Sequence, residues 1–184
     1  MVTFVAEFAD VTIEINSLFQ STREFCQDYL SDAKPDFAIS ISPEDIDYER
    51  ECSREVSLKE FGEAINYSDE YLETVAVSRK ISAKMSEHGV LYFHGSAIAV
   101  DGKAYIFTAP SGTGKSTHVN LWRQKFGNRA ITINDDKPFL RITDEKILVC
   151  GSPWDGKHRI SSNVKIPLKA ICILERGESN SIEE

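Results

Sequence analysis

The stretch APSGTGKST, residues 109–117, follows an apolar run at 104–108 and precedes a segment with helical spacing. Its glycines allow the backbone to curl so that successive N–H groups point inward toward an anion. The N-terminus of the following helix adds unpaired N–H groups and the positive end of its dipole. Lys115 would bring a positive charge to the outer phosphates, and the hydroxyl of Ser116 suits a magnesium ion. The order of strand, loop and helix predicts a phosphate-binding loop, although Ala109 stands where the strict pattern has glycine. A glycine-rich turn without a ligand is the alternative.

Short apolar runs of β type lie on both sides of this loop. They cover residues 90–93, 96–100, 104–108, 131–133, 146–149 and 170–174. Asp101-Gly102, between the second and third runs, favours a tight hairpin. Residues 115–126 have helical spacing and are followed by Gly127, which is typical of a helix end. The pattern predicts an α/β fold with a mixed β core over residues 88–184.

The first part of the chain, residues 1–87, predicts a smaller α+β region. The spacing predicts strands over 3–8, 11–15 and 37–41, and helices over 18–31 and 68–88. Ser17 has the residue type favoured at the N-cap of the first helix, and Gly89 ends the second. Residues 44–60 are acidic and weakly periodic, which predicts a loop or an exposed edge. We place the domain boundary near residue 88.

The composition excludes several classes of protein. Of the 184 residues, 41% are hydrophobic and 27% charged, as in ordinary globular domains. A net charge of −8 argues against nonspecific binding of nucleic acid. No apolar run is long enough to cross a bilayer, and the N-terminus does not look like a signal peptide. The four cysteines have no metal-ligand spacing, so we expect reduced thiols in a cytoplasmic protein without a membrane or nucleic-acid partner.

Two adjacent carboxylates, Asp135 and Asp136, follow Asn134 at the end of the predicted strand 131–133. A carboxylate at a strand end beside a phosphate loop can hold Mg²⁺, directly or through water. A second carboxylate can accept a proton from an attacking hydroxyl or bind a second metal ion. The alternative is a simple turn, which these residue types also favour. The residues do not decide which aspartate has which role.

Further candidates surround this pair. His94 precedes the phosphate loop by one hairpin, and spacing alone does not separate a structural from a functional role. Residues 151–157 form a second glycine-containing segment, in which Lys157 could meet phosphate or substrate. The alternative there is a surface turn anchored by Trp154. On the loop helix lie His118 and Trp122, and we expect Trp122 to serve packing.

The order of His94-Gly95-Ser96-Ala97, the SGTGKS segment at 111–116 and Asp135-Asp136 resembles the nucleotide-binding core of the HPr kinase/phosphorylase and phosphoenolpyruvate carboxykinase superfamily. The resemblance covers about residues 88–175, and residues 1–87 match nothing that we can name. The letters of the loop are closer to the carboxykinases. The small size is closer to HPr kinase and its relatives, which phosphorylate serine.

The resemblance implies ATP and Mg²⁺ as cofactors. The implied nucleotide-binding residues are Ser111, Gly112, Thr113, Gly114, Lys115, Ser116 and Thr117. The implied metal ligands are Ser116, Asp135 and Asp136, and the implied catalytic residues are His94, Lys115, Asp135 and Asp136. GTP or pyrophosphate as the phosphoryl donor stays open.

Three functions follow from this resemblance. The first is an ATP-dependent kinase that transfers the γ-phosphate to a hydroxyl, with serine of a protein or peptide as the acceptor. The second is a non-catalytic ATP-binding module that acts with a partner protein. It is kept because no counterpart of the HPr kinase signature follows Asp135-Asp136, and the chain stops soon after the strand 170–174, as a truncated member would. A carboxykinase-like enzyme comes third, because its arginine-rich substrate site has no counterpart. Residues 1–87 could bind the acceptor, brace the core or form an oligomer contact.

Overall fold

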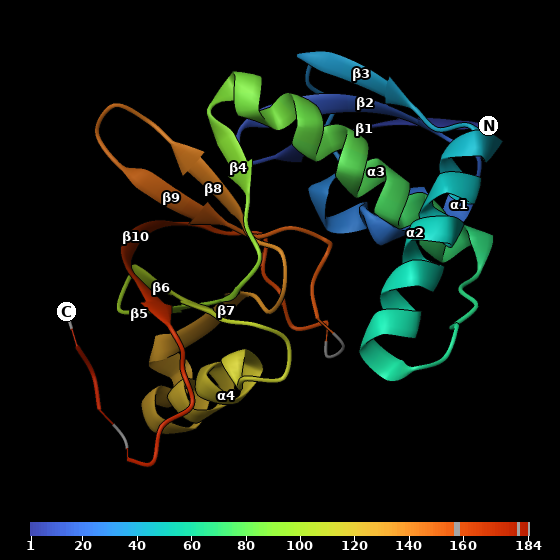
Figure 1. Ribbon diagram of the computed structural model, residues 1–184. Coiled ribbons are helices and arrows are strands. Elements are labelled where there is room, and N and C mark those ends of the chain that lie inside the picture. The colour runs from blue at the N-terminus through green and yellow to red at the C-terminus, as the bar shows by residue number, and fades with distance from the viewer. Residues whose placement is uncertain (157–158, 180, 184) are drawn as a thin grey trace. The chain divides into compact units, whose positions relative to one another are not determined.

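A computed structural model describes residues 1–156, 159–179 and 181–183 (Figure 1). The chain divides into two compact units, Met1–Leu91 and Tyr92–Glu184. Helices and β-sheets both contribute, which confirms the mixed α/β class predicted from the sequence. No helix in the described part of the chain is long and apolar enough to cross a membrane.

The sheet of the first unit has the order β1-β2-β3. Its strands are β1 (Val2–Phe8), β2 (Val11–Ser17) and β3 (Phe37–Ser40). The first two form an antiparallel hairpin, and β3 pairs with β2 in parallel. Ala9 and Asp10 both have positive φ, 51° and 62°, the conformation that a two-residue hairpin turn requires. The predicted strands of this region are therefore confirmed.

The helical segments of the first unit are α1 (Gln20–Phe25), η1 (Gln27–Tyr29), α2 (Pro43–Phe61), α3 (Asp69–Met85) and η2 (Ser86–His88). Ser68 caps α3, and Gly89 ends η2 with φ 71°, as predicted. The helix predicted over 18–31 is shorter in the structure, and Ser17 is not its N-cap. Ser17 is the last residue of β2, and its hydroxyl lies 3.1 Å from the carbonyl oxygen of Phe19, the actual N-cap residue.

The prediction of a loop or edge over residues 44–60 is wrong, because this segment is the helix α2. Ser42 and Asp45 form a capping box at its N-terminus, and the backbone N–H of Ser42 donates to Asp45 over 2.9 Å. Ion pairs with α3 hold the exposed helix: Arg79 pairs with Glu49, and Lys80 with Asp45. Capping and charge, rather than an apolar stripe, define this helix.

The seven-stranded sheet, of which all strands but β4 lie wholly in the second unit, has the order β4-β8-β9-β10-β6-β5-β7. Its strands are β4 (Val90–Tyr92), β5 (Ser96–Val100), β6 (Lys103–Thr108), β7 (Ala130–Asn134), β8 (Phe139–Ile142), β9 (Ile147–Cys150) and β10 (Lys165–Ile173). The pair β10–β6 is parallel, whereas β5 is antiparallel to both β6 and β7. The hairpin predicted at Asp101-Gly102 is confirmed, with φ of 51° and 74°. The strand β8 was not predicted.

Helix α4 (Lys115–Phe126) covers one face of this sheet and is followed by η3 (Gly127–Arg129) (Figure 1). Val119 of α4 packs on Ile98 and Phe107, with Trp122 at the edge of this cluster, so the predicted packing role of Trp122 is confirmed. A second cluster fills the other face of the strands. It contains Ala97, Ala99, Ala104, Ile106, Ile133, Leu140 and Val149. Packing on both faces of the sheet thus fixes the positions at which β6 and β7 end.

A buried carboxylate in the first unit generates a test of the fold. Glu73 of α3 is fully buried and accepts hydrogen bonds from the backbone N–H groups of Leu18 and Phe19 and from the hydroxyl of Thr22. Glu73→Ala would leave these donors unpaired and should lower the free energy of unfolding by about 2 kcal/mol or more. Glu55→Ala, the same change at an exposed position of α2, is the control. Equal urea midpoints for the two variants would contradict the anchoring role of Glu73.

Candidate functional site

A glycine-containing loop, residues 109–114, connects β6 to α4 and is called the glycine loop below. Gly112 has φ 74° and Gly114 has φ 120°, a backbone region that side-chain-bearing residues rarely adopt. Gly114 is also the N-cap of α4, and its carbonyl oxygen accepts the first helical hydrogen bond from the N–H of His118 over 3.0 Å. The glycines therefore allow the tight path between strand and helix.

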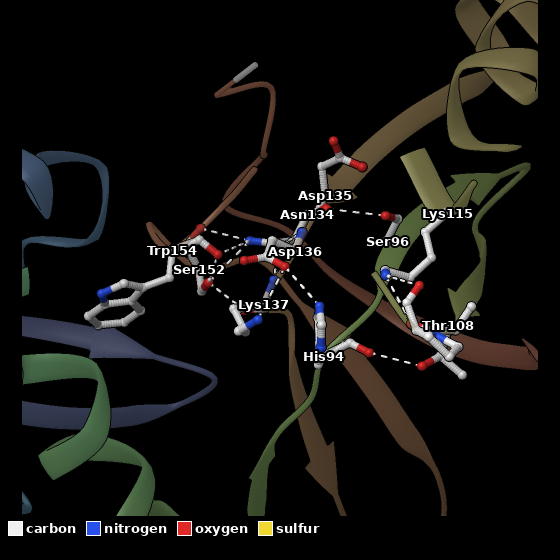
Figure 2. A network of polar contacts seen from close by, with 12 residues as sticks. His94, Ser96, Thr108, Lys115, Asn134, Asp135, Asp136, Lys137, Ser152 and Trp154 are labelled. Carbon is white, nitrogen blue, oxygen red and sulfur yellow. Dashed lines mark hydrogen bonds and ion pairs between the residues drawn. The ribbon is translucent and has the colours of Figure 1, made fainter. Parts of the chain in front are cut away.

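Lys115, the first residue of α4, folds back over the glycine loop (Figure 2). Its ammonium group donates to the carbonyl oxygen of Ala109 over 2.9 Å and lies 3.4 Å from that of Pro110. Because these partners are neutral, the positive charge of Lys115 is not cancelled by them. The glycine loop thus holds the positively charged ammonium group of Lys115.

A cavity of about 480 Å³ adjoins the glycine loop. Its lining residues are His94, Ser111, Gly112, Gly114, Lys115, Ser116, Thr117, Asp135, Asp136 and Gly156. Each residue to which the resemblance assigns a nucleotide-binding, metal-binding or catalytic role lines this cavity, except Thr113, whose N–H donates to the carbonyl oxygen of Pro110 over 3.3 Å. Lys157, the other sequence candidate, lies outside the described residues.

A larger, more open depression of about 710 Å³ lies at the C-terminal end of α4. Its lining residues are Asn120, Arg123, Gln124, Gly127, Asn128 and Ala130. These offer amides and one guanidinium but neither a carboxylate nor a turn of inward N–H groups. The smaller cavity is therefore the better candidate for chemistry.

The buried side chain of Asn134, at the end of β7, positions the far wall of the cavity (Figure 2). Its Nδ2 donates to the carbonyl oxygen of Ser152 over 3.0 Å and lies 3.4 Å from that of Trp154. Its Oδ1 accepts from the backbone N–H groups of Asp136, at 2.8 Å, and Lys137, at 2.6 Å. The amide therefore fastens the segment 152–154 and the turn that carries the two aspartates to the same strand end.

Asp135 is 7% exposed, and its Oδ1 has no hydrogen-bond partner in the part of the chain that the structure describes. Its backbone carbonyl oxygen accepts from the hydroxyl of Ser96 over 3.1 Å. A Cβ added to Gly156 would lie 3.1 Å from the Oδ2 of Asp135, so the absence of a side chain at Gly156 leaves room for this carboxylate. A buried carboxylate oxygen without a partner is costly unless a ligand binds it.

Asp136, the second carboxylate, is more exposed and lies beside His94 and the ammonium of Lys137. Its Oδ1 is 3.2 Å from the Nε2 of His94 and 3.2 Å from the ammonium of Lys137. Partial burial lowers the pKa of His94, and Lys137 lowers it further, while Asp136 opposes both effects. His94 is therefore neutral near pH 7 and can donate or accept one hydrogen bond with each ring nitrogen.

Backbone contacts hold His94 in place. The hydroxyl of Thr108, at the end of β6, donates to its carbonyl oxygen over 3.0 Å, and the N–H of Gly95 donates to the carbonyl oxygen of Asp136 over 2.9 Å. A Cβ at Gly95 would come within 2.9 Å of both the Cγ2 of Ile106 and the carbonyl oxygen of Phe107. Glycine at this position therefore permits the close approach that brings His94 to the cavity.

In the described part of the second glycine-containing segment, residues 151–156, Trp154 is an anchor, as one of the two interpretations predicted. Trp154 is buried and makes edge contacts with the rings of Tyr92 and Phe139. On the loop helix, the ring of His118 stacks on Phe107 at 5.2 Å between centroids. Neither Trp154 nor His118 is among the residues that line the cavity.

The cavity offers oxygen donors that suit Mg²⁺ in the mode that combines few protein ligands with water and phosphates. Among the described residues, no group of three or more His, Cys, Asp or Glu side chains could enclose a metal ion. Mg²⁺, however, keeps several waters and commonly takes one or two carboxylates together with substrate phosphates. The unpartnered Oδ1 of Asp135 and the hydroxyl of Ser116 both line the cavity and suit that mode.

Sequence reasoning missed several residues of this site. Asn134, Ser152 and Gly156 lay within segments that the sequence singled out but were given no role, and Lys137 was not considered. A further residue, Arg176, donates to the carbonyl oxygen of Gly112 over 2.9 Å. Asn134 before two aspartates at a strand end was a usable signal for a turn-fixing amide. Nothing in the local sequence connects Arg176 with the glycine loop.

Comparison with known proteins gives limited information. No protein-family model matches the chain, and no curated protein matches it. Among solved structures, it is similar to the Hpr(Ser) kinase/phosphatase from Coxiella burnetii, at 11% sequence identity and a TM-score of 0.39. The match covers 50% of this chain and 64% of that chain, less than two thirds of its length. At this score the likeness carries no conclusion about the activity of this chain.

The charges around His94 generate a prediction about its titration. Without added magnesium, its NMR titration midpoint should lie below the usual 6.5. Lys137→Gln should raise the pKa because a neighbouring cation is lost, and Asp136→Asn should lower it because a favourable anion is lost. The stability contributed by neutral His94 is present above pH 6.5 and is lost as the pH falls. A midpoint above 6.5, or shifts of the opposite sign, would contradict this arrangement.

Proposed function

We propose that this chain binds Mg²⁺-ATP in the cavity beside the glycine loop and transfers its γ-phosphate to a hydroxyl, with serine of a protein or peptide as the acceptor class. The observation that carries the proposal is the buried Oδ1 of Asp135, which has no partner in the described residues and belongs to the same cavity as Lys115. A carboxylate and a cation that line one cavity suit a ligand that combines phosphates with a metal ion.

The glycine loop supplies the phosphate side of this site. Two residues with positive φ curl the backbone, and the N-terminus of α4 opens toward the cavity at Lys115. Unpaired N–H groups there favour anions, and the ammonium of Lys115 can move from neutral carbonyl oxygens to a phosphate at little cost. We therefore assign residues 111–117 to the phosphates, with the hydroxyl of Ser116 at the metal.

The two aspartates have different surroundings, and we assign them different roles. Asp135 is buried and unpartnered, which suits a metal ligand, and bound Mg²⁺ would neutralise charge on the phosphate oxygens. The side chain of Asp136 is 38% exposed and is held by His94 and Lys137, so a hydroxyl acceptor can reach it. Asp136 would take the acceptor's proton while the acceptor oxygen bonds to the γ-phosphorus and the bond to the β-phosphate oxygen breaks, leaving ADP.

Resemblance in sequence supports the same assignment. The segments that resemble the HPr kinase and carboxykinase superfamily are residues 94–97, 111–116 and 135–136. Members of all three segments line the cavity, although the segments are separated along the chain. We propose an HPr kinase-like relationship on this coincidence of order and placement.

One test of the proposed function concerns the binding of nucleotide. At about a hundred times the dissociation constant, Mg²⁺-ATP should stabilise the protein by about 2.7 kcal/mol, and Lys115→Ala should abolish most of this effect. Lys169→Ala removes the same charge from an exposed position of β10 and is the matched control. Thermal unfolding with ATP, GTP and pyrophosphate, each with Mg²⁺, measures the effect. Stabilisation that survives Lys115→Ala would place the nucleotide elsewhere.

Another test distinguishes the proposed roles of Asp135 and Asp136. Asp135→Asn should remove most of the Mg²⁺ dependence of ATP affinity, whereas Asp136→Asn should bind Mg²⁺-ATP nearly as well as the wild type. Asp136→Asn should also lower the rate of ADP formation with a serine-containing peptide library by a factor of about 10²–10⁴. Calorimetry and an ADP assay measure these quantities. Wild-type binding without ADP formation would favour the non-catalytic module, and an unchanged rate in Asp136→Asn would remove Asp136 from the mechanism.

A further inference from the structure

The chain returns to the glycine loop after β10. Because β10 and β6 are parallel, both strands finish at the same edge of the sheet. The N–H of Leu174 donates to the carbonyl oxygen of Thr108 over 2.9 Å, which extends the pairing by one residue beyond the strand end. The segment that follows Leu174 therefore leaves the sheet directly beside the start of the glycine loop.

Arg176 lies in that segment and touches the tip of the loop. Its Nη2 donates to the carbonyl oxygen of Gly112 over 2.9 Å, and Gly112 lines the cavity. The guanidinium is exposed, and a single carbonyl oxygen occupies only part of a group with five N–H donors in a planar fork. Arg176 thus lies at the rim of the cavity and has N–H donors that its contact with Gly112 does not use.

The charges of the cavity leave a role for this cation. Lys137 is paired with Asp136, and Asp135 adds a second negative charge to the wall. Among the described residues, Lys115 is therefore the cation that contributes to the cavity beside the glycine loop without an ion pair to a carboxylate. Within the residues that the structure describes, Arg176 has no ion pair with a carboxylate. A polyphosphate in the cavity would therefore gain from a second cation, and Arg176 is the one that touches the loop.

We propose that Arg176 is an additional phosphate-binding residue of this cavity, supplied from the segment after β10, and this rests on the proposed nucleotide site. The Gly112 carbonyl oxygen holds the guanidinium at the loop tip, and the remaining donors of the fork bind phosphate oxygens. Arginine suits this role because its planar fork matches phosphate geometry in a bidentate manner. Arg176 lies about 60 residues after Lys115 in the sequence, far along the chain from the glycine loop.

The test compares Arg176→Gln and Arg176→Lys with the wild type by calorimetry, using Mg²⁺-ATP and, separately, Mg²⁺-pyrophosphate, which has no base or ribose. Arg176→Gln should weaken the binding of both ligands by about tenfold or more, and Arg176→Lys should recover part of the loss. Arg123→Gln, which removes the same charge from the far end of α4, should bind both ligands as the wild type does. The melting temperature without ligand should not change in Arg176→Gln, because the side chain is exposed.

Salt dependence gives a second readout that a purely structural role would not move. A direct contact between cation and phosphate is screened by ions, so affinity should fall less steeply with salt in Arg176→Gln than in the wild type. Equal affinities of Arg176→Gln and the wild type for pyrophosphate would overturn the proposal. A loss confined to ATP would also overturn it, because the guanidinium would then serve the base. If the wild type binds neither ligand, the nucleotide site itself fails, an outcome distinct from failure at Arg176 alone.

Discussion

The amide of Asn134 is the interaction on which the candidate site depends. Its NH₂ group binds the segment 152–154, and its oxygen binds two backbone N–H groups of the aspartate turn, all within the core. Aspartate at this position would lack the donors, and leucine would lack both functions, so one uncharged side chain serves two loops. The amide carries no charge, so it positions the turn without forming an ion pair with Asp135, whose Oδ1 has no partner in the described residues.

The opposite wall of the cavity is made by backbone geometry rather than by side chains. Gly112 and Gly114 adopt positive φ, so the loop can turn tightly into α4 and present Lys115. His94 connects the two walls, since its ring faces Asp136 while its carbonyl oxygen is held by Thr108 at the end of β6. If the proposed function holds, the helix N-terminus on one side and the carboxylates on the other would be preorganised for a ligand that carries both phosphate and metal.

The sequence predicted those parts of the fold that local signals determine. Helices α3 and α4, the hairpin at Asp101-Gly102 and the strands around the glycine loop all have capping residues, turn residues or regular spacing. Helix α2 was missed because its stability comes from Ser42, Asp45 and charges on α3, which periodicity does not report. The strand β8 is short, and its pairing with β9 is a tertiary fact. The resemblance in sequence grouped His94, the glycine loop and the two aspartates, and these line one cavity. The burial of Asp135 and the approach of Arg176 could not be read from sequence, because they depend on strand order. The roles of the site residues remain predictions.

The position of β10 in the sheet has a consequence for how the protein is made. This strand follows the other six strands of the sheet in sequence, yet it lies between β9 and β6 and connects the β4-β8-β9 portion of the sheet to β6-β5-β7. Until residues 165–173 have left the ribosome, β6 and β9 each expose an unpaired edge, and the nascent chain is open to misassembly at those edges. The glycine loop follows β6 directly, so the cavity would gain its final shape only when β10 inserts between β6 and β9. The candidate site would thus form only after residues 165–173 have been synthesised, well after the glycine loop itself has been translated.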